Sequence, residues 1–221
     1  MEVTPALILA MWTAGMAGGA AVVSQWEIVG PGYGWLTSAV ITIAGGVTAL
    51  AGGSPIGVLA TLAALVAGLM ARRQRIAAVL FAVAALGFLA VAVPDGGFFA
   101  AISGSVLLGG MTSEMLLGHW FLVDPQLPRW ALRRLGVVAG IGLVAEVVVV
   151  VALGAFGSSD TVMIAALAAL AAMTALLVAA VWFSLKETGY SGVMAATGLS
   201  YLGVLTTFGV VVVGRLLVEG L

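Results

Sequence analysis

Cysteine is absent from this chain, and charged residues make up only 8% of it. The lack of cysteine excludes disulfides, thiolate-bound metals, iron–sulfur clusters and cysteine nucleophiles. A formal net charge of −1 leaves no basic surface for nucleic acid. The single histidine cannot ligate heme b from both faces, nor can it build a metal site of the two-histidine type.

Apolar residues are what the chain has in abundance. They form 63% of its 221 residues, and the mean hydropathy is +1.26, far above a soluble domain. The first residues lack the positive start of a cleavable signal, and the apolar runs lack the alternation of barrel strands. Eight runs are long enough to cross a bilayer as helices, at 5–23, 33–51, 55–71, 76–93, 98–123, 132–156, 161–185 and 191–217. The sequence therefore predicts an all-α polytopic membrane protein with no soluble domain.

Prolines and cations support this count. All six prolines fall at the predicted ends of spans, where a missing N–H costs least. Seven of the eight cations fall in the third, fifth and seventh connections, namely Arg72, Arg73, Arg75, Arg129, Arg133, Arg134 and Lys186. By the positive-inside rule these connections are cytoplasmic, and both termini lie on the non-cytoplasmic side of the inner (cytoplasmic) membrane.

A repeat divides the chain. The stretch "QWEIVGP" (25–31) aligns without gaps on "HWFLVDP" (119–125), and each closes the first span of a four-span unit. We expect two tandem four-helix halves, 1–96 and 97–221, within one membrane domain and related by an axis along the membrane normal. The alternative is that an interfacial Trp and a helix-ending Pro recur for shared physical reasons.

Two carboxylates inside predicted spans are candidates for a proton relay. Glu114 is flanked by Gly110 and Gly118, and Glu146 shares its face with Gly142. Ionisable groups within a span are costly and are functional candidates by default. Helix rise places them roughly 14 Å and 18 Å from the cytoplasmic side, so we expect them to approach each other. The alternative role is structural, with each carboxyl bonded to a backbone carbonyl.

Three further side chains are candidates for binding a quinone. His119 could hydrogen-bond one carbonyl of the headgroup, with Trp120 beside it. Tyr201, in the hydroxyl-rich last span, would face the bundle as a donor or simply pack. A structural or interfacial role for His119 is the alternative. No metal site is expected.

Eight apolar spans in two halves, without cofactor ligands, resemble the NrfD-type membrane anchors of polysulfide- and DMSO-reductase complexes. The last span, "TGLSYLGVLTTFGVVVVGRLL" (197–217), is similar to the final helix of the DMSO-reductase anchor. Such anchors bind quinone or quinol and pass its electrons to a partner subunit. The resemblance implies a quinone site drawn from His119, Trp120 and Glu114, and it implies redox partner subunits in the membrane.

Three functions follow as hypotheses. The first is an integral subunit of a respiratory-type redox complex that binds quinone or quinol and conducts protons, at most the membrane anchor of an oxidoreductase. The second is a scaffold subunit without chemistry of its own. The third is a small proton-coupled transporter working between the two halves.

Overall fold

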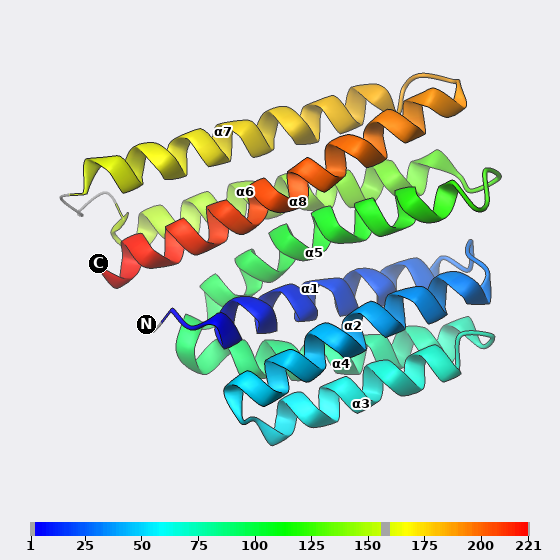
Figure 1. Ribbon diagram of the computed structural model, residues 1–221, viewed down its shortest axis with the longest axis horizontal. Helices are drawn as coiled ribbons and strands as arrows, with labels where there is room; N and C mark the ends of the chain where they lie inside the picture. The colour runs from blue at the N-terminus through cyan, green and yellow to red at the C-terminus, as the bar shows by residue number, and fades with distance from the viewer. Residues whose placement is uncertain (1–2, 156–159, 221) are drawn as a thin grey trace.

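The computed structural model describes residues 3–155 and 160–220. Over those residues the chain forms eight α-helices and no β-strand, which confirms the predicted all-α membrane architecture (Figure 1). The helices are α1 (Pro5–Gln25), α2 (Pro31–Gly52), α3 (Pro55–Leu69), α4 (Gln74–Gly96), α5 (Phe98–Phe121), α6 (Arg129–Ala152), α7 (Thr161–Ser184) and α8 (Tyr190–Glu219). The residue predicted to end the sixth span, 156, lies outside the described residues.

Seven of these helices are long and apolar enough to cross a membrane, and α3 is the short one. Its 15 residues cover about 22 Å of a hydrocarbon core about 30 Å thick. α3 nevertheless packs along both α2 and α4. It therefore carries the chain back across the bundle, as the eight-span prediction requires.

Local sequence explains where the helices start. Proline occupies the first position of α1, α2 and α3, where its missing N–H has no helical partner to lose. The side chains of Thr4 and Ser54 cap α1 and α3 by accepting from backbone N–H groups of the first turn. One expectation was wrong: Pro94 lies inside α4, because that helix continues to Gly96 before it ends.

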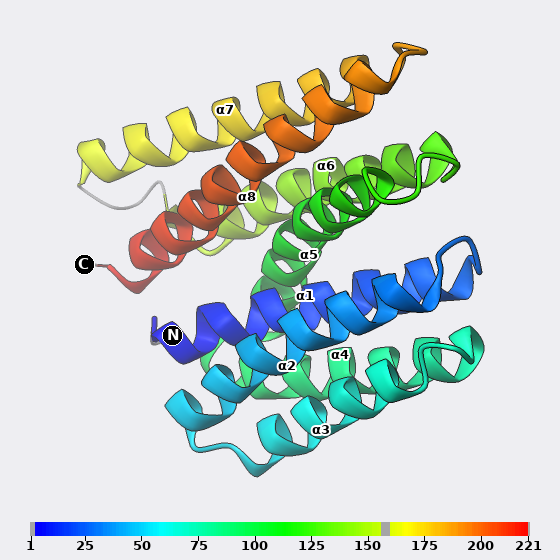
Figure 2. The ribbon, with the colours of Figure 1, turned by 45° about the vertical axis from the view of Figure 1, so that its right-hand side comes forward.

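The helices form two groups of four, α1–α4 and α5–α8 (Figures 1 and 2). In each group the first helix packs against the second and the fourth, and the third lies between those two. Gly97 alone, with a φ of 73°, separates α4 from α5 and so the two groups. A tandem duplication with a boundary after residue 96 would produce this arrangement, and the duplication itself stays a prediction.

Contact between the two groups runs mainly through α1 and α5. A Cβ built on Gly15 of α1 would lie 2.1 Å from the backbone oxygen of Ser105, and one on Gly109 of α5 would lie 2.3 Å from the Cα of Gly15. The two backbones touch because no side chain separates them, as is common between membrane helices. α5 also packs against α6 and α8, and it is the most buried of the seven long helices.

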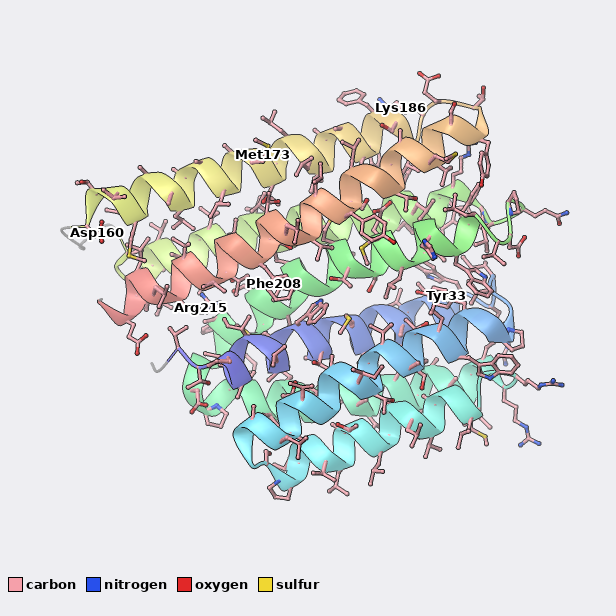
Figure 3. The ribbon with its side chains drawn as sticks, viewed as in Figure 1. Tyr33, Asp160, Met173, Lys186, Phe208 and Arg215 are labelled. Atoms are coloured by element: carbon pink, nitrogen blue, oxygen red, sulfur yellow. The ribbon has the colours of Figure 1, made fainter. Side chains whose placement is uncertain are left out.

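The two ends of the bundle differ in charge. Arg72, Lys186 and the other five cations of the predicted cytoplasmic connections lie at one end, on the right in Figure 1. Both chain termini lie at the opposite end, near Asp160 and Arg215 (Figure 3). The cations therefore gather on one side of a bundle with an even number of passages.

We predict that labelling of introduced cysteines will show the basic end inside the cell. Asp95→Cys and Gln126→Cys change exposed residues at opposite ends of a chain with no cysteine of its own. In intact cells, a membrane-impermeant maleimide should label the cysteine at position 95 and reach position 126 only after permeabilisation. The reverse pattern would contradict the orientation, and labelling of both from outside would show that α5 does not cross the membrane.

We also predict that Gly15→Ala lowers the stability of the folded chain while Gly18→Ala does not. The new methyl group at position 15 must push α1 and α5 apart, at a cost of about 1–3 kcal/mol in the free energy of unfolding. A Cβ at Gly18 meets only the Ala85 Cβ, at 4.0 Å, so it serves as the matched control. Thermal unfolding in detergent measures both variants. Equal unfolding temperatures would show that α1 and α5 are not in close contact.

Candidate functional site

α5 carries several of the polar side chains that occupy the interior of the bundle. Ser103, Thr112 and Glu114 are each almost fully buried, and each contacts a side chain from another helix. Small residues on α5 let the neighbouring helices come close enough for these contacts. The polar contacts of α5 therefore form separate clusters along this helix.

The first cluster is an ion pair between Glu146 of α6 and Arg215 of α8, and both side chains are 0% exposed. The Nη1 atom of Arg215 lies 2.9 Å from Oε1 of Glu146, and Nη2 donates to Oε2 at 3.0 Å. Only the Nη2–Oε2 contact is a hydrogen bond; Nη1 and Oε1 are in ion-pair contact and have no hydrogen-bond partner. The pair ties α6 to α8 within the apolar interior.

α5 completes this cluster. The Ser103 hydroxyl donates to Oε2 of Glu146 at 2.5 Å, and Arg215 Nη2 also donates to the carbonyl oxygen of Ala100 at 2.6 Å. A Cβ on Gly104 would lie 3.3 Å from Arg215 Nη2, so the glycine leaves room for the guanidinium. Arg215 Nε remains without a hydrogen-bond partner. These contacts favour a structural role for Glu146, and its role in a proton relay stays a prediction.

The structure does not bring Glu146 to Glu114, contrary to our expectation. α6 begins at Arg129, so Glu146 lies seventeen residues, or about 25 Å, from the basic end of its helix. Glu114 lies seven residues, or about 10 Å, from the end of α5. Ser103, the α5 residue that contacts Glu146, is eleven residues from Glu114. α5 ends two residues before the end of its predicted span and α6 begins three residues before the start of its own, so Glu114 lies nearer the basic end and Glu146 farther from it than expected.

Glu114 belongs to a second cluster, on the seam between α5 and α8. The Ser200 hydroxyl donates to Glu114 Oε2, and Oε1 is buried without a hydrogen-bond partner. One turn further along, Thr197 packs so closely on Gly118 that a Cβ there would lie 2.5 Å from its hydroxyl oxygen. No cation pairs with Glu114 among the residues of the described ranges. One oxygen of this carboxyl is thus left open for a proton or a hydrogen bond.

His119 and Tyr201 lie on the exposed edge of the same seam. The Tyr201 hydroxyl lies 3.4 Å from Nδ1 of His119, and both side chains are exposed, Tyr201 by 48%. Tyr201 thus faces outward, whereas the sequence suggested that it faces the bundle. Between residues 3 and 155 and from 160 to 220, no group of three or more His, Asp or Glu side chains could hold a metal ion.

Trp120 is next to His119 in sequence but contacts a different helix. Its ring lies edge-on to Tyr33 of α2, with centroids 6.3 Å apart, and its six-membered ring fills the space left by Gly32. Its indole Nε1 is buried without a hydrogen-bond partner. The structure therefore brings His119 and Tyr201 together and leaves Trp120 on the α2 side.

The sequence analysis missed Arg215 as the partner of Glu146, although a signal was present. Arg215 is the only cation outside the basic end, and it follows a run of apolar residues in the last span. An arginine within a span requires a carboxylate or carbonyl partner. Glu146 was one of only two carboxylates within the predicted spans, so the pairing could have been proposed.

We predict that breaking the Glu146–Arg215 pair from one side costs more than removing both partners. Glu146→Gln or Arg215→Met leaves one buried charge alone, which should lower the free energy of unfolding by about 3–5 kcal/mol. The double variant should lose less than the sum of the two. Thermal unfolding in detergent of the two single variants and the double variant measures this double-mutant cycle. Glu187→Gln, which changes an exposed residue, is the control. Additive losses would contradict a direct interaction between the two residues.

Comparison with protein-family models, curated proteins and solved structures finds no match to this chain. The resemblance to NrfD-type anchors therefore stays a prediction. What the protein does has to be argued from its own geometry.

Proposed function

We propose that this chain is an integral membrane subunit of a respiratory-type redox complex, and that it binds a quinone or quinol at the α5–α8 seam. The observation that carries the proposal is the second cluster: a buried carboxyl with an open oxygen, Glu114, on the same two helices as the exposed His119–Tyr201 contact. Each of these groups supplies one function that quinone chemistry needs.

The exposed side chains of His119 and Tyr201 can bind the headgroup of a quinone. A quinone reaches its site through the hydrocarbon phase, so its binding groups must be open to the membrane. An imidazole nitrogen and a phenol hydroxyl can each donate to a quinone oxygen or accept from a quinol hydroxyl. His119 and Tyr201 lie at the bundle surface, where they can exchange their mutual contact for contacts with the ring.

Glu114 can accept a proton that is released when quinol is oxidised. Oxidation of a quinol releases two electrons and two protons, and a carboxyl with one free oxygen can receive a proton and pass it on. The electrons must go to a redox centre of a partner subunit, because the sequence offers neither cysteine ligands nor two histidines for a heme. The short connections between helices leave such a partner access to both ends of the bundle.

The scaffold alternative is supported by the first cluster. Glu146 and Arg215 are sealed inside the bundle and hold α6 to α8 without an opening to either side. The transporter alternative has less support, because buried Leu107, Leu108 and Met111 lie on α5 between Ser103 and Glu114. The buried polar side chains of α5 between Ser103 and Glu114 are the hydroxyls of Ser105, Thr112 and Ser113, and no ionisable group lies there.

We predict that the chain, purified with its partners in mild detergent, carries about one quinone per copy in a solvent extract. Tyr201→Phe and His119→Ala should each reduce the bound quinone several-fold, since each removes one hydrogen bond to the ring. Tyr190→Phe, an exposed tyrosine at the start of α8, is the matched control. Glu114→Gln should retain the quinone and slow its turnover.

The outcomes separate the hypotheses. If no quinone is extracted and electron transfer is unchanged in His119→Ala, the proposal is wrong and the scaffold role is favoured. A scaffold also predicts that substitution of Glu114 or His119 lowers assembly and activity in proportion. Proton flux into proteoliposomes of the isolated chain, lost in Glu114→Gln, would favour the transporter.

A further inference from the structure

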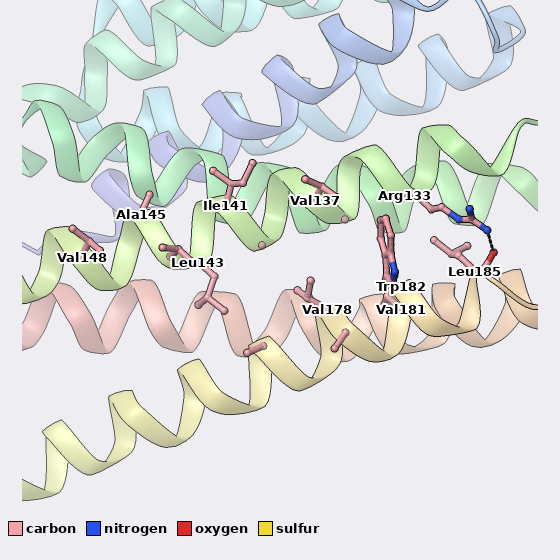
Figure 4. A pocket seen from close by; sticks show the side chains of 15 residues that line it. Arg133, Val137, Ile141, Leu143, Ala145, Val148, Val178, Val181, Trp182 and Leu185 are labelled. Atoms are coloured by element: carbon pink, nitrogen blue, oxygen red, sulfur yellow. Dashed lines mark hydrogen bonds between the residues drawn. The ribbon is translucent and has the colours of Figure 1, made fainter.

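A groove runs between α6 and α7, on the outer side of the second group of helices. These two neighbours pack against each other less extensively than any other neighbouring helices in the two groups. The space between them has a volume of about 740 Å³, within the range of about 300–1,000 Å³ that is usual for ligand sites. Its walls are almost entirely apolar, with Ile141 and Val144 on α6 and Val178 and Trp182 on α7 (Figure 4).

Two glycines of α6 leave this groove unfilled. A third glycine of the same helix, on the side that faces α5, instead lets α5 and α6 pack closely together. A Cβ on Gly142, which faces α5, would lie 2.5 Å from the backbone nitrogen of Leu107. A Cβ on Gly136 would meet nothing within 4 Å, and one on Gly140 would meet only Val178 Cγ1, at 3.6 Å. The small residues at 136 and 140 therefore widen a space that no side chain of this protein fills.

One cation lies at the basic end of the groove. Arg133 lines it and donates from Nη2 to the carbonyl oxygen of Leu185 at 2.8 Å (Figure 4). Its Nε is buried and has no hydrogen-bond partner. Next to Arg133 in sequence, the Arg134 guanidinium stacks on Trp130, 4.6 Å from the ring centroid.

The surrounding charges at this end are mainly positive. Lys186, just after α7, lies over the Phe183 ring at 4.7 Å, and Arg129 at the start of α6 bonds the carbonyl oxygens of the α7–α8 connection. The acidic side chains nearest in sequence are Asp124 and Glu187. Cations therefore outnumber acids where the groove meets the headgroup layer.

We propose that the α6–α7 groove binds one anionic phospholipid, with an acyl chain between the helices and the phosphate at Arg133. An apolar channel with a single cation at its end is complementary to an amphiphile of that polarity. Basic pockets between transmembrane helices at the cytoplasmic face are known to hold anionic headgroups. A partner helix of apolar side chains would fill the channel but would bring no anion to the Arg133 guanidinium. This inference does not depend on the proposed function.

Lipid titration of the purified chain in an uncharged detergent tests the proposal, with dioleoylphosphatidylglycerol and dioleoylphosphatidylcholine as probes. Native mass spectrometry counts bound lipid, and thermal unfolding reports stabilisation. One phosphatidylglycerol should bind per chain and raise the unfolding temperature more than phosphatidylcholine does. Free glycerol phosphate should have no effect, because it lacks the acyl chain.

Two variants locate the site. Arg133→Gln should weaken phosphatidylglycerol binding about tenfold, the effect of losing one charged hydrogen bond. Gly136→Leu/Gly140→Leu adds side chains to the apolar channel at two positions where a Cβ meets no backbone atom within 4 Å, and should abolish specific binding. Arg72→Gln, at the basic end of the first group, and Gly46→Leu, where a Cβ meets nothing within 4 Å, are the matched controls.

The following results would overturn the proposal. Equal binding of phosphatidylglycerol and phosphatidylcholine would show that the charge of the headgroup does not contribute to binding. Unchanged binding in both Arg133→Gln and the glycine double variant would show that the lipid binds elsewhere. Loss of a co-purifying membrane protein, with lipid retention unchanged, in the glycine double variant would identify a partner helix as the occupant instead.

Discussion

A membrane interior offers no water to polar groups, and the centre of this protein is organised around that constraint. α5 bears five of the buried polar side chains, and three of them, Ser103, Thr112 and Glu114, have a partner on another helix. Glycines such as Gly15, Gly109 and Gly142 bring the neighbouring backbones close enough for those partners to reach α5. Close packing and polar pairing thus depend on each other: without the glycines the hydrogen bonds lengthen, and without the bonds the carboxylates would be isolated in hydrocarbon.

The two buried carboxyls, Glu146 and Glu114, have different hydrogen-bond partners, and this difference indicates different roles. Glu146 is matched by a full opposite charge, a charged hydrogen bond from that residue and a hydroxyl, all typical of a residue that holds helices together. Glu114 has one hydroxyl partner and an unoccupied oxygen, close to the membrane-facing edge of its seam. A group that exchanges protons has to keep one position open, so Glu114 rather than Glu146 is the residue on which we base the proposed chemistry.

Composition and periodicity were enough to predict the helical membrane architecture, because length and hydropathy decide which segments can cross a bilayer. The burial of both glutamates could also be argued from sequence. The side-chain pairings could not. Whether Glu146 meets Glu114 or Arg215 depends on the exact end of α5 and the exact start of α6, and on which of their residues face α8. Trp120 likewise turns toward α2 because Gly32 leaves space there, a contact between segments far apart in sequence.

The central claim is that α5 is the buried polar axis and that α7 is largely exposed to lipid. The most direct test is photolabelling of the chain in lipid nanodiscs with a diazirine reagent dissolved in the acyl phase, followed by peptide mass spectrometry. The structure predicts heavy labelling along α7 and almost none on α5 from Ser103 to Leu117, where nearly every side chain is buried. Comparable labelling of α5 and α7 would contradict the account, because Glu114 and the Glu146–Arg215 pair would then lie open to lipid.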